Sequence, residues 1–565
     1  MPLLPSLLAS GTALLAATTT AATTVPHVSR DSKPLVKRCT HSATERSCWG
    51  DYDLTTDYYN VVPDTGVTRE YYLELSNTTA APDGYSRDVL LVNGTFPGPT
   101  LFADWGDTVI VTVYNGLENN GTSIHFHGIR QNMTNQNDGV ASITQCPTAP
   151  GETVTYTWRA TQYGSTWYHS HFGLQAWEGV LGGIIINGPA TANYENDMGV
   201  MFLNDWTHQT ADAMYITAET DGPPTLDNGL INGTNVYGDV GSRFETTVTA
   251  GETYRIRLVN GAIDTHWKFM IDSHNFTVIA MDLVPIVPYE TSMLSIGMGQ
   301  RYDIVLSASA SSGDYWIRAI PQVACSDNDS ADNIMGILRY DSTSTADPTT
   351  SAYTYTDTCN DEDMSTLVPY LSKTVSTEDL DDDFAVTVGK SDSVFKWYMA
   401  GTTFEVEWAN PTLLQIYNEE TNWTTSSHVI ELPTDSQWVY FIIETTQAVP
   451  HPIHLHGHDF FVIAQGNGTY DSTTATLSLD NPPRRDVAML PSAGYLVIAF
   501  ETDNPGAWLL HCHIGWHTSE GFALQLVERY SEINALIDYD TLNSTCAAWD
   551  DYVAVSGVEE EDSGV

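Results

Sequence analysis

The sequence predicts an all-β protein built from three β-sandwich domains, and three observations support this. The chain has 565 residues, and single hydrophobic cores stop growing at about 250–300 residues. A β-rich run over residues 106–115 recurs over 251–260, and more loosely over 438–444. The first two copies lie about 145 residues apart, which indicates duplicated domains. Short strands that end in turn-forming residues are typical of β-sandwiches.

The repeats give the order of the domains along the chain. We expect the first sandwich over residues 39–190, the second over 191–345 and the third over 384–565. The segment 346–383 is rich in Ser, Thr and Asp and ends in an acidic run. Such a composition is typical of a solvated linker.

The N-terminal region predicts secretion. Residues 3–17 form an apolar run that has the length of a signal peptide and is too short to span a bilayer. Lys37-Arg38 stands directly before Cys39 like a dibasic processing site, so we expect residues 1–38 to be a signal peptide and pro-segment. Glycosylation sequons agree with a secreted glycoprotein. They lie at Asn77, Asn93, Asn120, Asn132, Asn232, Asn275, Asn328, Asn422, Asn467 and Asn543.

The charge of the chain excludes some partners. Its 22 basic and 71 acidic residues give a formal net charge of -49. Such a charge disfavours nucleic acid and anionic membranes as partners. No segment after the signal peptide is apolar enough for a membrane anchor. We therefore expect a soluble extracellular protein, and a monomer.

One stretch near the C-terminus predicts metal binding. Cys512 is bracketed by His511 and His513, and His517 follows five residues after the cysteine. A thiolate among several imidazoles is a typical metal site. Successive side chains of a strand point to opposite faces, so Cys512 and its two neighbours face different ways. We predict two metal centres joined through the backbone. A His, His, Cys site with a weak or absent fourth ligand is of the blue-copper electron-transfer type.

Ten of the seventeen histidines fall in four short windows. A buried core histidine is a reasonable interpretation of any one of them, but not of ten gathered in this way. The windows are His125-Phe126-His127-Gly128, His169-Ser170-His171, His451-Pro452-Ile453-His454-Leu455-His456 and His511-Cys512-His513 with His517. With these motifs in this order, residues 39–565 resemble the multicopper oxidases, in particular laccases of the ascomycete type. The resemblance implies three Greek-key sandwiches of the cupredoxin type.

The repeats differ at the metal positions. Gly164, Gly313 and Gly506 each precede the corresponding triplet by five residues. The triplets read His-Ser-His at 169–171, Arg-Ala-Ile at 318–320 and His-Cys-His at 511–513. The middle domain has therefore lost its ligands, and only the third holds the thiolate. No single domain supplies enough ligands for a cluster, so we expect the first and third domains to face each other.

The resemblance implies four copper ions, one of type 1, one of type 2 and two of type 3. Type 1 copper would be held by His451, Cys512 and His517, with Phe522 in the axial position. Phenylalanine has no lone pair, so Cu(I) is favoured and a high reduction potential is expected. The other ligands would be His125 and His454 for type 2, and His127, His169, His171, His456, His511 and His513 for the type 3 pair.

The resemblance also implies roles for residues that do not bind metal. Asp138 matches the acid that supplies protons near the type 2 copper. Asp205 matches the acid that accepts a phenolic proton, although a turn residue is an equal interpretation of a lone Asp. His451 is expected to face the donor pocket and take in the electron. Gly515 stands where many relatives have a second acid, and the absence of that acid puts a second proton route in doubt. Structural roles are expected for His208, His266, His274, His428 and His458.

Seven cysteines are consistent with an oxidising compartment. If Cys512 binds copper, six remain, and six allow fifteen pairings. Cys39 and Cys48 are close enough in sequence for a local loop. The resemblance implies the pairs Cys146–Cys546 and Cys325–Cys359.

These observations predict a secreted laccase that oxidises phenols or aromatic amines by one electron each and reduces dioxygen to water. One alternative is another multicopper oxidase such as a ferroxidase, which typically has an axial Met and, in fungi, a membrane anchor. A second is a copper electron-transfer protein without oxygen chemistry, which would not need the cluster histidines. The acidic tail 559–565 resembles the C-terminal plug of ascomycete laccases, and we expect it to regulate access to the cluster.

Overall fold

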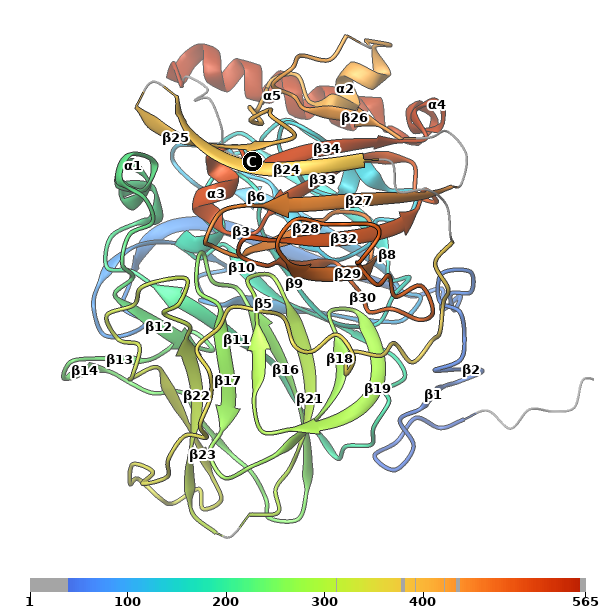
Figure 1. The fold of residues 1–565 in the computed structure, drawn as a ribbon. Helices are drawn as coiled ribbons and strands as arrows, with labels where there is room; N and C mark the ends of the chain where they lie inside the picture. The colour runs from blue at the N-terminus through green and yellow to red at the C-terminus, as the bar shows by residue number, and fades with distance from the viewer. Residues whose placement is uncertain are drawn as a thin grey trace, which may run out of the picture. The chain divides into compact units, whose positions relative to one another are not determined.

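The computed structural model describes residues 39–310, 312–376, 382–391, 393–420, 422–432 and 437–558, with the backbone alone at 382–384 (Figure 1). The predicted signal peptide and pro-segment (1–38) and the predicted C-terminal plug (559–565) lie outside these ranges. Among the described helices, none is both long enough and apolar enough to cross a lipid bilayer.

Two four-stranded sheets form the first sandwich. Buried and partly exposed residues alternate along β6, so Val109, Val111 and Val113 all point inward. They share one hydrophobic core with Leu101 and Ile184 of the other sheet. The strand orders are β4-β3-β6-β8 and β5-β10-β9-β7. Their bounds are β3 (Thr68–Ala80), β4 (Arg87–Val92), β5 (Gly98–Asp104), β6 (Thr108–Asn115), β7 (Ile124–His127), β8 (Thr153–Arg159), β9 (Gly164–Ser170) and β10 (Leu181–Asn187).

A six-stranded and a five-stranded sheet form the second sandwich. Their orders are β12-β11-β16-β21-β18-β19 and β15-β23-β22-β17-β20. The inner strands β16 and β17 are buried along nearly their whole length, including their charged residues Arg255, Arg257 and Lys268. The bounds are β11 (Asn196–Trp206), β12 (Asn228–Ile231), β15 (Glu245–Thr247), β16 (Thr253–Asn260), β17 (Trp267–Ile271), β18 (Phe276–Met281), β19 (Val284–Thr291), β20 (Leu294–Ile296), β21 (Arg301–Ser307), β22 (Asp314–Pro321) and β23 (Met335–Arg339).

The third sandwich repeats this arrangement. Its sheets have the orders β25-β24-β27-β32-β29-β30 and β26-β34-β33-β28-β31. The bounds are β24 (Asp382–Ser391), β25 (Val394–Met399), β26 (Val429–Glu431), β27 (Trp438–Thr445), β28 (His451–Leu455), β29 (Phe460–Asn467), β30 (Arg484–Arg485), β31 (Val487–Leu490), β32 (Gly494–Glu501), β33 (Gly506–Cys512) and β34 (Ala523–Glu528).

The topology bears out the repeats seen in the sequence. The three repeated runs become β6, β16 and β27, each the third strand of its sheet. Each pairs in parallel with the first long strand of its own copy: β6 with β3, β16 with β11 and β27 with β24. The all-β prediction of three cupredoxin-like sandwiches is confirmed. The exact boundaries between the domains stay a prediction.

The segment between the second and third sandwiches is packed against both, contrary to the expectation of a solvated linker. Leu367 and Val375 are buried, with 0% and 1% of their surface exposed. The amide of Val287 donates to the Val368 carbonyl, and that of Val375 donates to Leu479. Isolated apolar residues within a polar composition are enough to anchor an extended segment on both sandwiches, and the composition alone hides this.

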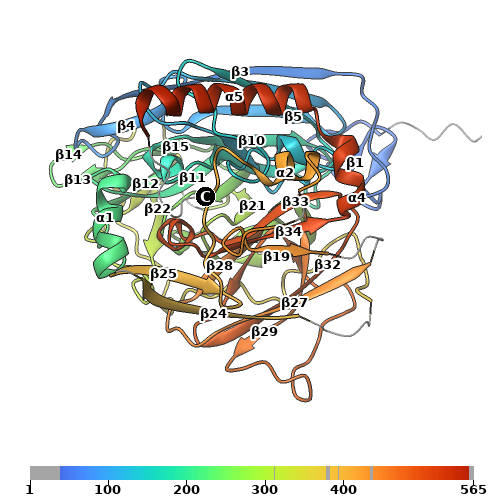
Figure 2. The same ribbon diagram turned by 90° about the horizontal axis from the view of Figure 1, so that it is seen from above.

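Helices are few and lie at the edges of the sandwiches. The longest, α5 (Tyr539–Ser556), begins at Asp538, whose side chain accepts from the Thr541 amide, and ends at Gly557 in the left-handed conformation. It lies against the first sandwich, to which the Cys146–Cys546 disulfide ties it (Figure 2). Two further disulfides, Cys39–Cys48 and Cys325–Cys359, are present. The short elements are α1 (Ala211–Asp221), α2 (Thr412–Tyr417), α3 (Gly515–Ser519), α4 (Tyr530–Ile533), η1 (Asn135–Asn137), η2 (Gln175–Glu178), η3 (Asn534–Leu536), β1 (Cys48–Trp49), β2 (Tyr52–Asp53), β13 (Val236–Tyr237) and β14 (Val240–Gly241).

Candidate metal centre

Equivalent strands of the first and third sandwiches carry the histidine motifs. β7 pairs antiparallel with β9, which sets His125 directly opposite His169. β28 pairs antiparallel with β33, which sets His454 opposite His511. Opposed residues in an antiparallel pair have neighbouring side chains, so each sheet gathers its own imidazoles.

In the middle sandwich the corresponding strands are β17 and β22, and they hold no histidine pair. Arg318, at the position that corresponds to His169, instead forms an ion pair with Asp272, with two N···O distances of 2.8 Å. The predicted loss of ligands in this copy agrees with this contact.

The first and third sandwiches meet at these histidines. His125 stacks on His456 with ring centroids 4.0 Å apart. His127 stacks on His454 at 3.9 Å, with only 8° between the ring planes. The expectation that the first and third domains face each other is confirmed.

The structure sorts the predicted ligands into small groups. In each group the possible ligand atoms lie within 4.8 Å of one another, and every member is buried. The groups are His127 with His169 and His513; His171 with His456 and His511; His125 with His127 and His454; His125 with Asp138 and His456; and His451 with Cys512 and His517. All eleven predicted ligands are therefore brought together in buried groups.

Hydrogen bonds orient the imidazoles of the cluster. Nδ1 of His125 lies 2.8 Å from the Asp138 carbonyl oxygen, and Nδ1 of His454 lies 2.7 Å from that of Asp486. A carbonyl only accepts, so in both rings Nδ1 carries the hydrogen and Nε2 keeps its lone pair. Both Nε2 atoms are buried without a partner in the protein. Two unpaired lone pairs in a buried site are suited to a metal ion.

Burial keeps these imidazoles neutral. It lowers the pKa of His511 and His451 to about 3. It also lowers the pKa of His127, His169 and His456 well below the usual value, and neighbouring imidazoles add to the effect. A neutral imidazole has a lone pair to donate, so these five rings are ready to bind a metal at mildly acidic pH.

The thiolate group lies on the other face of β33. The Cys512 sulfur is 3.9 Å from His451 Nδ1 and 3.7 Å from His517 Nδ1, and these two nitrogens are 3.3 Å apart. The Ile514 amide donates to the sulfur at 3.5 Å. Burial raises the pKa of the Cys512 thiol, so a metal ion would have to displace the proton when it binds.

Aromatic rings close this site. Phe522, the predicted axial residue, lies edge-on to His451 at 5.1 Å. Trp397 stacks on Phe522 at 5.4 Å and contacts the His517 ring at 4.3 Å. Neither ring offers a lone pair in the axial direction. The arrangement suits a three-ligand copper site with a weak fourth position.

Asp138 lies between the two sandwiches and touches both. Its Oδ2 accepts from His456 Nδ1 at 2.8 Å, and its Oδ1 is 3.3 Å from His125 Nδ1. The side chain is buried. This carboxylate is therefore in direct hydrogen-bond contact with the cluster, at the place where the sequence predicts a proton donor.

The sequence predicts donor-side roles for two residues. The position of His451 at the donor pocket stays a prediction, because both rings are buried: His451 is 0% exposed and contacts Trp397 and Phe522, and His517 is 4% exposed. Asp205 is saturated by hydrogen bonds from the amides of residues 263–265 and from the Thr265 hydroxyl, over 2.9–3.1 Å. It thus closes a turn, and the cavity beside it, of about 10 Å³, is too small for an aromatic donor.

Three histidines outside the candidate ligand groups have other partners. His458 lies 2.7 Å from Glu528, and His208 lies 2.9 Å from Asp83. His274 Nε2 lies 2.8 Å from the Tyr340 hydroxyl. These contacts agree with the structural roles expected for these three residues.

Sequence reasoning missed two residues that touch or hold the cluster. Asp486 Oδ1 lies 3.2 Å from His127 Nε2, and Arg301 pairs with the same carboxylate from the second sandwich. A signal was available, because Arg485-Asp486 is a charged pair directly before the apolar strand β31. Buried charges at the start of a core strand are costly unless they are paired.

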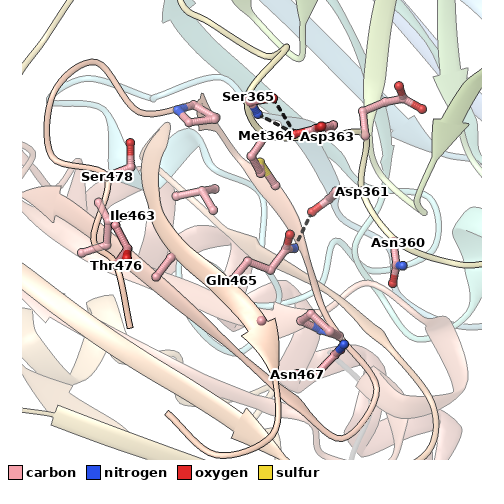
Figure 3. A pocket seen from close by; sticks show the side chains of 16 residues that line it. Asn360, Asp361, Asp363, Met364, Ser365, Ile463, Gln465, Asn467, Thr476 and Ser478 are labelled. Carbon is pink, nitrogen blue, oxygen red and sulfur yellow. Dashed lines mark hydrogen bonds between the residues drawn. The ribbon is translucent and has the colours of Figure 1, made fainter. Parts of the chain in front are cut away.

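One open cavity has no histidine in its lining. It has a volume of about 540 Å³ and is open to solvent, between residues 360–365 and the strand β29 (Figure 3). Polar side chains such as Asp361, Gln465 and Asn467 line it, and Asp361 accepts from Gln465 at 2.9 Å. Its size therefore does not mark it as the site of the metal chemistry.

Comparisons with known proteins agree with this geometry. Multicopper oxidase family models match residues 74–191, 197–343 and 401–532. Laccase-2 of Botryotinia fuckeliana is 49% identical, over 96% of this chain and 97% of its own length. Laccase-1 of the same fungus is 50% identical over 93% of this chain and 94% of its own. The crystal structure of the laccase from Botrytis aclada superposes with a TM-score of 0.91 at 49% identity, covering 93% of this chain and all of the other. The chain belongs to the multicopper oxidase family, within its branch of fungal laccases.

Proposed function

We propose that this laccase takes single electrons from phenols or aromatic amines and uses four of them to reduce dioxygen to water. The observation that carries the proposal is the cluster of eight buried imidazoles joined by one peptide unit on each side to Cys512. An electron-transfer protein would need the Cys512 group alone. A ferroxidase of the membrane-anchored kind typically has an axial thioether, where this chain has Phe522.

We assign four copper ions to the observed groups. Type 1 copper belongs to the group of His451, Cys512 and His517. The two triplets of cluster histidines have three imidazoles each and match the two type 3 ions, whereas His125 and His454 have the unpaired Nε2 atoms of the type 2 site. When bound, copper supplies the one-electron redox chemistry and the sites at which dioxygen is reduced.

The chain supplies the path for the electron. Cys512 is followed directly by His513 and preceded by His511, so a thiolate ligand is bonded through the backbone to a ligand of each type 3 triplet. The Cys512 carbonyl also accepts from His511 Nδ1 at 2.8 Å. This contact gives a second, hydrogen-bonded link between the two centres.

The chain also places a carboxylate beside the cluster. We assign the proton-supplying role to Asp138, because its carboxylate contacts both His125 and His456. A second acid cannot stand at position 515, since a Cβ on Gly515 would lie 2.6 Å from side-chain atoms of Ile263 and Trp177. We further propose that the protein is secreted and monomeric.

Copper content and oxygen uptake test this function together. We expect about four coppers per chain, an intense visible band from the thiolate-bound copper, and oxygen uptake with a phenol that releases no peroxide. One copper with the same band and no oxygen uptake would leave an electron-transfer protein and would remove the cluster assignments.

A further inference from the structure

We propose that Asp486 and Arg301 hold the His127 imidazole in the orientation that the cluster requires, so that the second sandwich, which has no ligands, determines part of the copper site. The inference rests on the proposed function, because it concerns the same cluster. It assigns a positioning role to two residues, one from the third sandwich and one from the second.

The His127 ring is turned the opposite way from its neighbours. In His169 and His511, Nδ1 donates to a backbone carbonyl, at 2.9 and 2.8 Å, and Nε2 points into the cluster. In His127, Nδ1 points into the cluster, 3.4 Å from His169 Nε2, and Nε2 lies 3.2 Å from Asp486 Oδ1. An ionised carboxylate only accepts, so the hydrogen of His127 is on Nε2 and the lone pair on Nδ1.

This orientation needs a partner from outside the strand. Nδ1 lies near the backbone of its own residue, so the carbonyl of the next residue serves His169 and His511, at Ser170 and Cys512. Nε2 is at the far end of the ring and no neighbouring carbonyl reaches it. The acceptor is Asp486, 359 residues further along the chain. Without it the hydrogen could move to Nδ1, which would remove the ligand atom.

Arg301 fixes the position of the Asp486 carboxylate. Its guanidinium donates to both carboxylate oxygens, with Nη2 at 2.6 Å from Oδ2. Both side chains are buried. Paired contacts of this kind fix the plane of the carboxylate as well as its position. A Cβ on Gly128, next to His127, would collide with both groups, so the glycine leaves the space that they fill.

The second sandwich also touches the rings directly. The loop before β21 passes so close that a Cβ on Gly299 would lie 2.9 Å from His513 Cδ2 and 3.1 Å from His127 Cε1. The Gly299 carbonyl accepts from Arg301 Nη1 at 3.2 Å. One loop of this sandwich therefore packs against two type 3 ligands and holds the arginine that fixes Asp486.

Charges of alternating sign continue from this pair toward the surface. Arg301 lies 3.5 Å from Asp282, Asp282 accepts from Arg485 at 3.1 Å, and Arg485 lies 3.5 Å from Asp361. Asp361 lines the open cavity of Figure 3. Buried ions are tolerated when each is paired, and here each charge has opposite neighbours. The network thus keeps the Arg301 and Asp486 side chains in place.

The test compares two variants with variants of a matched control pair in the second sandwich. Asp486→Ala removes the acceptor, and Arg301→Lys keeps the charge but loses the two-point contact. The controls are Asp272→Ala and Arg318→Lys, since Arg318 and Asp272 form a similar two-point ion pair that is distant from the histidine motifs in sequence and belongs to none of the ligand groups. For each protein, copper per chain, the thiolate–copper absorption band and oxygen uptake are measured.

We expect Asp486→Ala to keep the thiolate band, to lose copper from the cluster, and to lose oxygen uptake by about 10- to 100-fold. Arg301→Lys should show the same loss to a smaller extent, and the controls should resemble the unmodified enzyme in copper content. If Asp486→Ala fails to fold and shows no thiolate band, the copper content of Arg301→Lys tests the positioning role instead. Copper content equal to that of the controls in both folded variants would overturn the inference, whereas an unmodified enzyme without cluster copper would overturn the proposed function itself.

Discussion

At the scale of single residues, the metal centre depends on which ring nitrogen of each histidine is left without a hydrogen-bond partner. Asp138 and Asp486 occupy one nitrogen of His456 and His127, respectively, and leave the other for copper. Around Cys512 the neighbours are apolar instead, so Phe522 and Trp397 shape the site by excluding other ligands. Polar contacts orient the imidazoles of the cluster, whereas aromatic packing closes the thiolate site.

Replacing Phe522 by Met tests the axial position. We expect Phe522→Met to lower the reduction potential of the type 1 copper, because a thioether can donate to Cu(II) and phenylalanine cannot. A swap of similar volume should cost less than about 1.5 kcal/mol of unfolding free energy, so the enzyme should remain folded. A redox titration of the thiolate band gives the potential. Phe522→Leu is the control, and equal potentials in both variants would contradict the axial assignment.

Glu520 makes the stability depend on pH. Burial raises its pKa from 4.5 to about 8, and its Oε2 accepts from the Trp397 indole at 2.9 Å. The folded state therefore keeps a proton that the unfolded chain has lost, and stability falls as pH rises toward 8. Below about pH 6.5 the unfolded chain binds protons that the buried neutral histidines do not, so stability there rises with pH. The effect of Glu520 should therefore be visible between pH 6.5 and 8.

Denaturant titrations at several pH values would measure this dependence. Glu520→Gln keeps the shape of the side chain and removes the titration. We expect the decline in unfolding free energy between pH 6.5 and 8 to become smaller in this variant than in the unmodified enzyme. An identical decline in both would show that other groups cause it.

At the scale of elements, strand pairing and turns place the site. β33 carries candidate ligands on both faces, and α3 begins after a connection of two residues, so that His517 turns back toward Cys512. Gly515 starts this helix and has no room for a Cβ because Ile263 and Trp177 pack against it. The turn that Asp205 closes, over residues 263–265, supplies part of this packing.

The variant Asp205→Ala distinguishes a turn residue from a proton acceptor. Four donors would lose their acceptor, so we expect a loss of unfolding free energy of at least about 1–3 kcal/mol. Oxidation of a phenol and of a donor that releases no proton should then fall by similar factors. Steady-state rates with the two donors measure this, and a selective loss of phenol oxidation would support the role as proton acceptor.

At the scale of the whole molecule, the surface is strongly acidic and carries most of the sequons. A net charge of -49 keeps such a chain in solution and favours cationic over anionic donors at the surface. Nine of the ten sequon asparagines are exposed or partly exposed. The exception is Asn328, which is 8% exposed.

We expect Asn328 to stay without glycan in protein from a glycosylating host. Its Nδ2 donates to the Asn228 carbonyl at 2.9 Å, and its Oδ1 accepts from the Ser330 amide. A glycan on this nitrogen would break a buried hydrogen bond and displace the neighbouring loop. Peptide mapping by mass spectrometry measures the occupancy, with exposed Asn275 and Asn543 as controls. Full occupancy at Asn328 would contradict the placement of this loop.

The sequence by itself determined the class of the fold, the repeat and the set of candidate ligands. Metal ligands are few in type and cluster in short motifs, so His125, His454 and Cys512 can be identified without coordinates. Repeated runs in which apolar and polar residues alternate likewise show where a sandwich recurs.

The groups that surround those ligands are visible only once the three sandwiches are assembled. Asp486 lies 359 residues from His127, and Arg301 comes from a sandwich whose own motif is lost, so the charged pair at 485–486 does not show in the sequence which groups it contacts. The burial of His451 and the four hydrogen bonds on Asp205 depend in the same way on packing between distant segments. Short motifs show which ligand types lie close together in the sequence, whereas the orientation and burial of their side chains depend on how the sandwiches pack together.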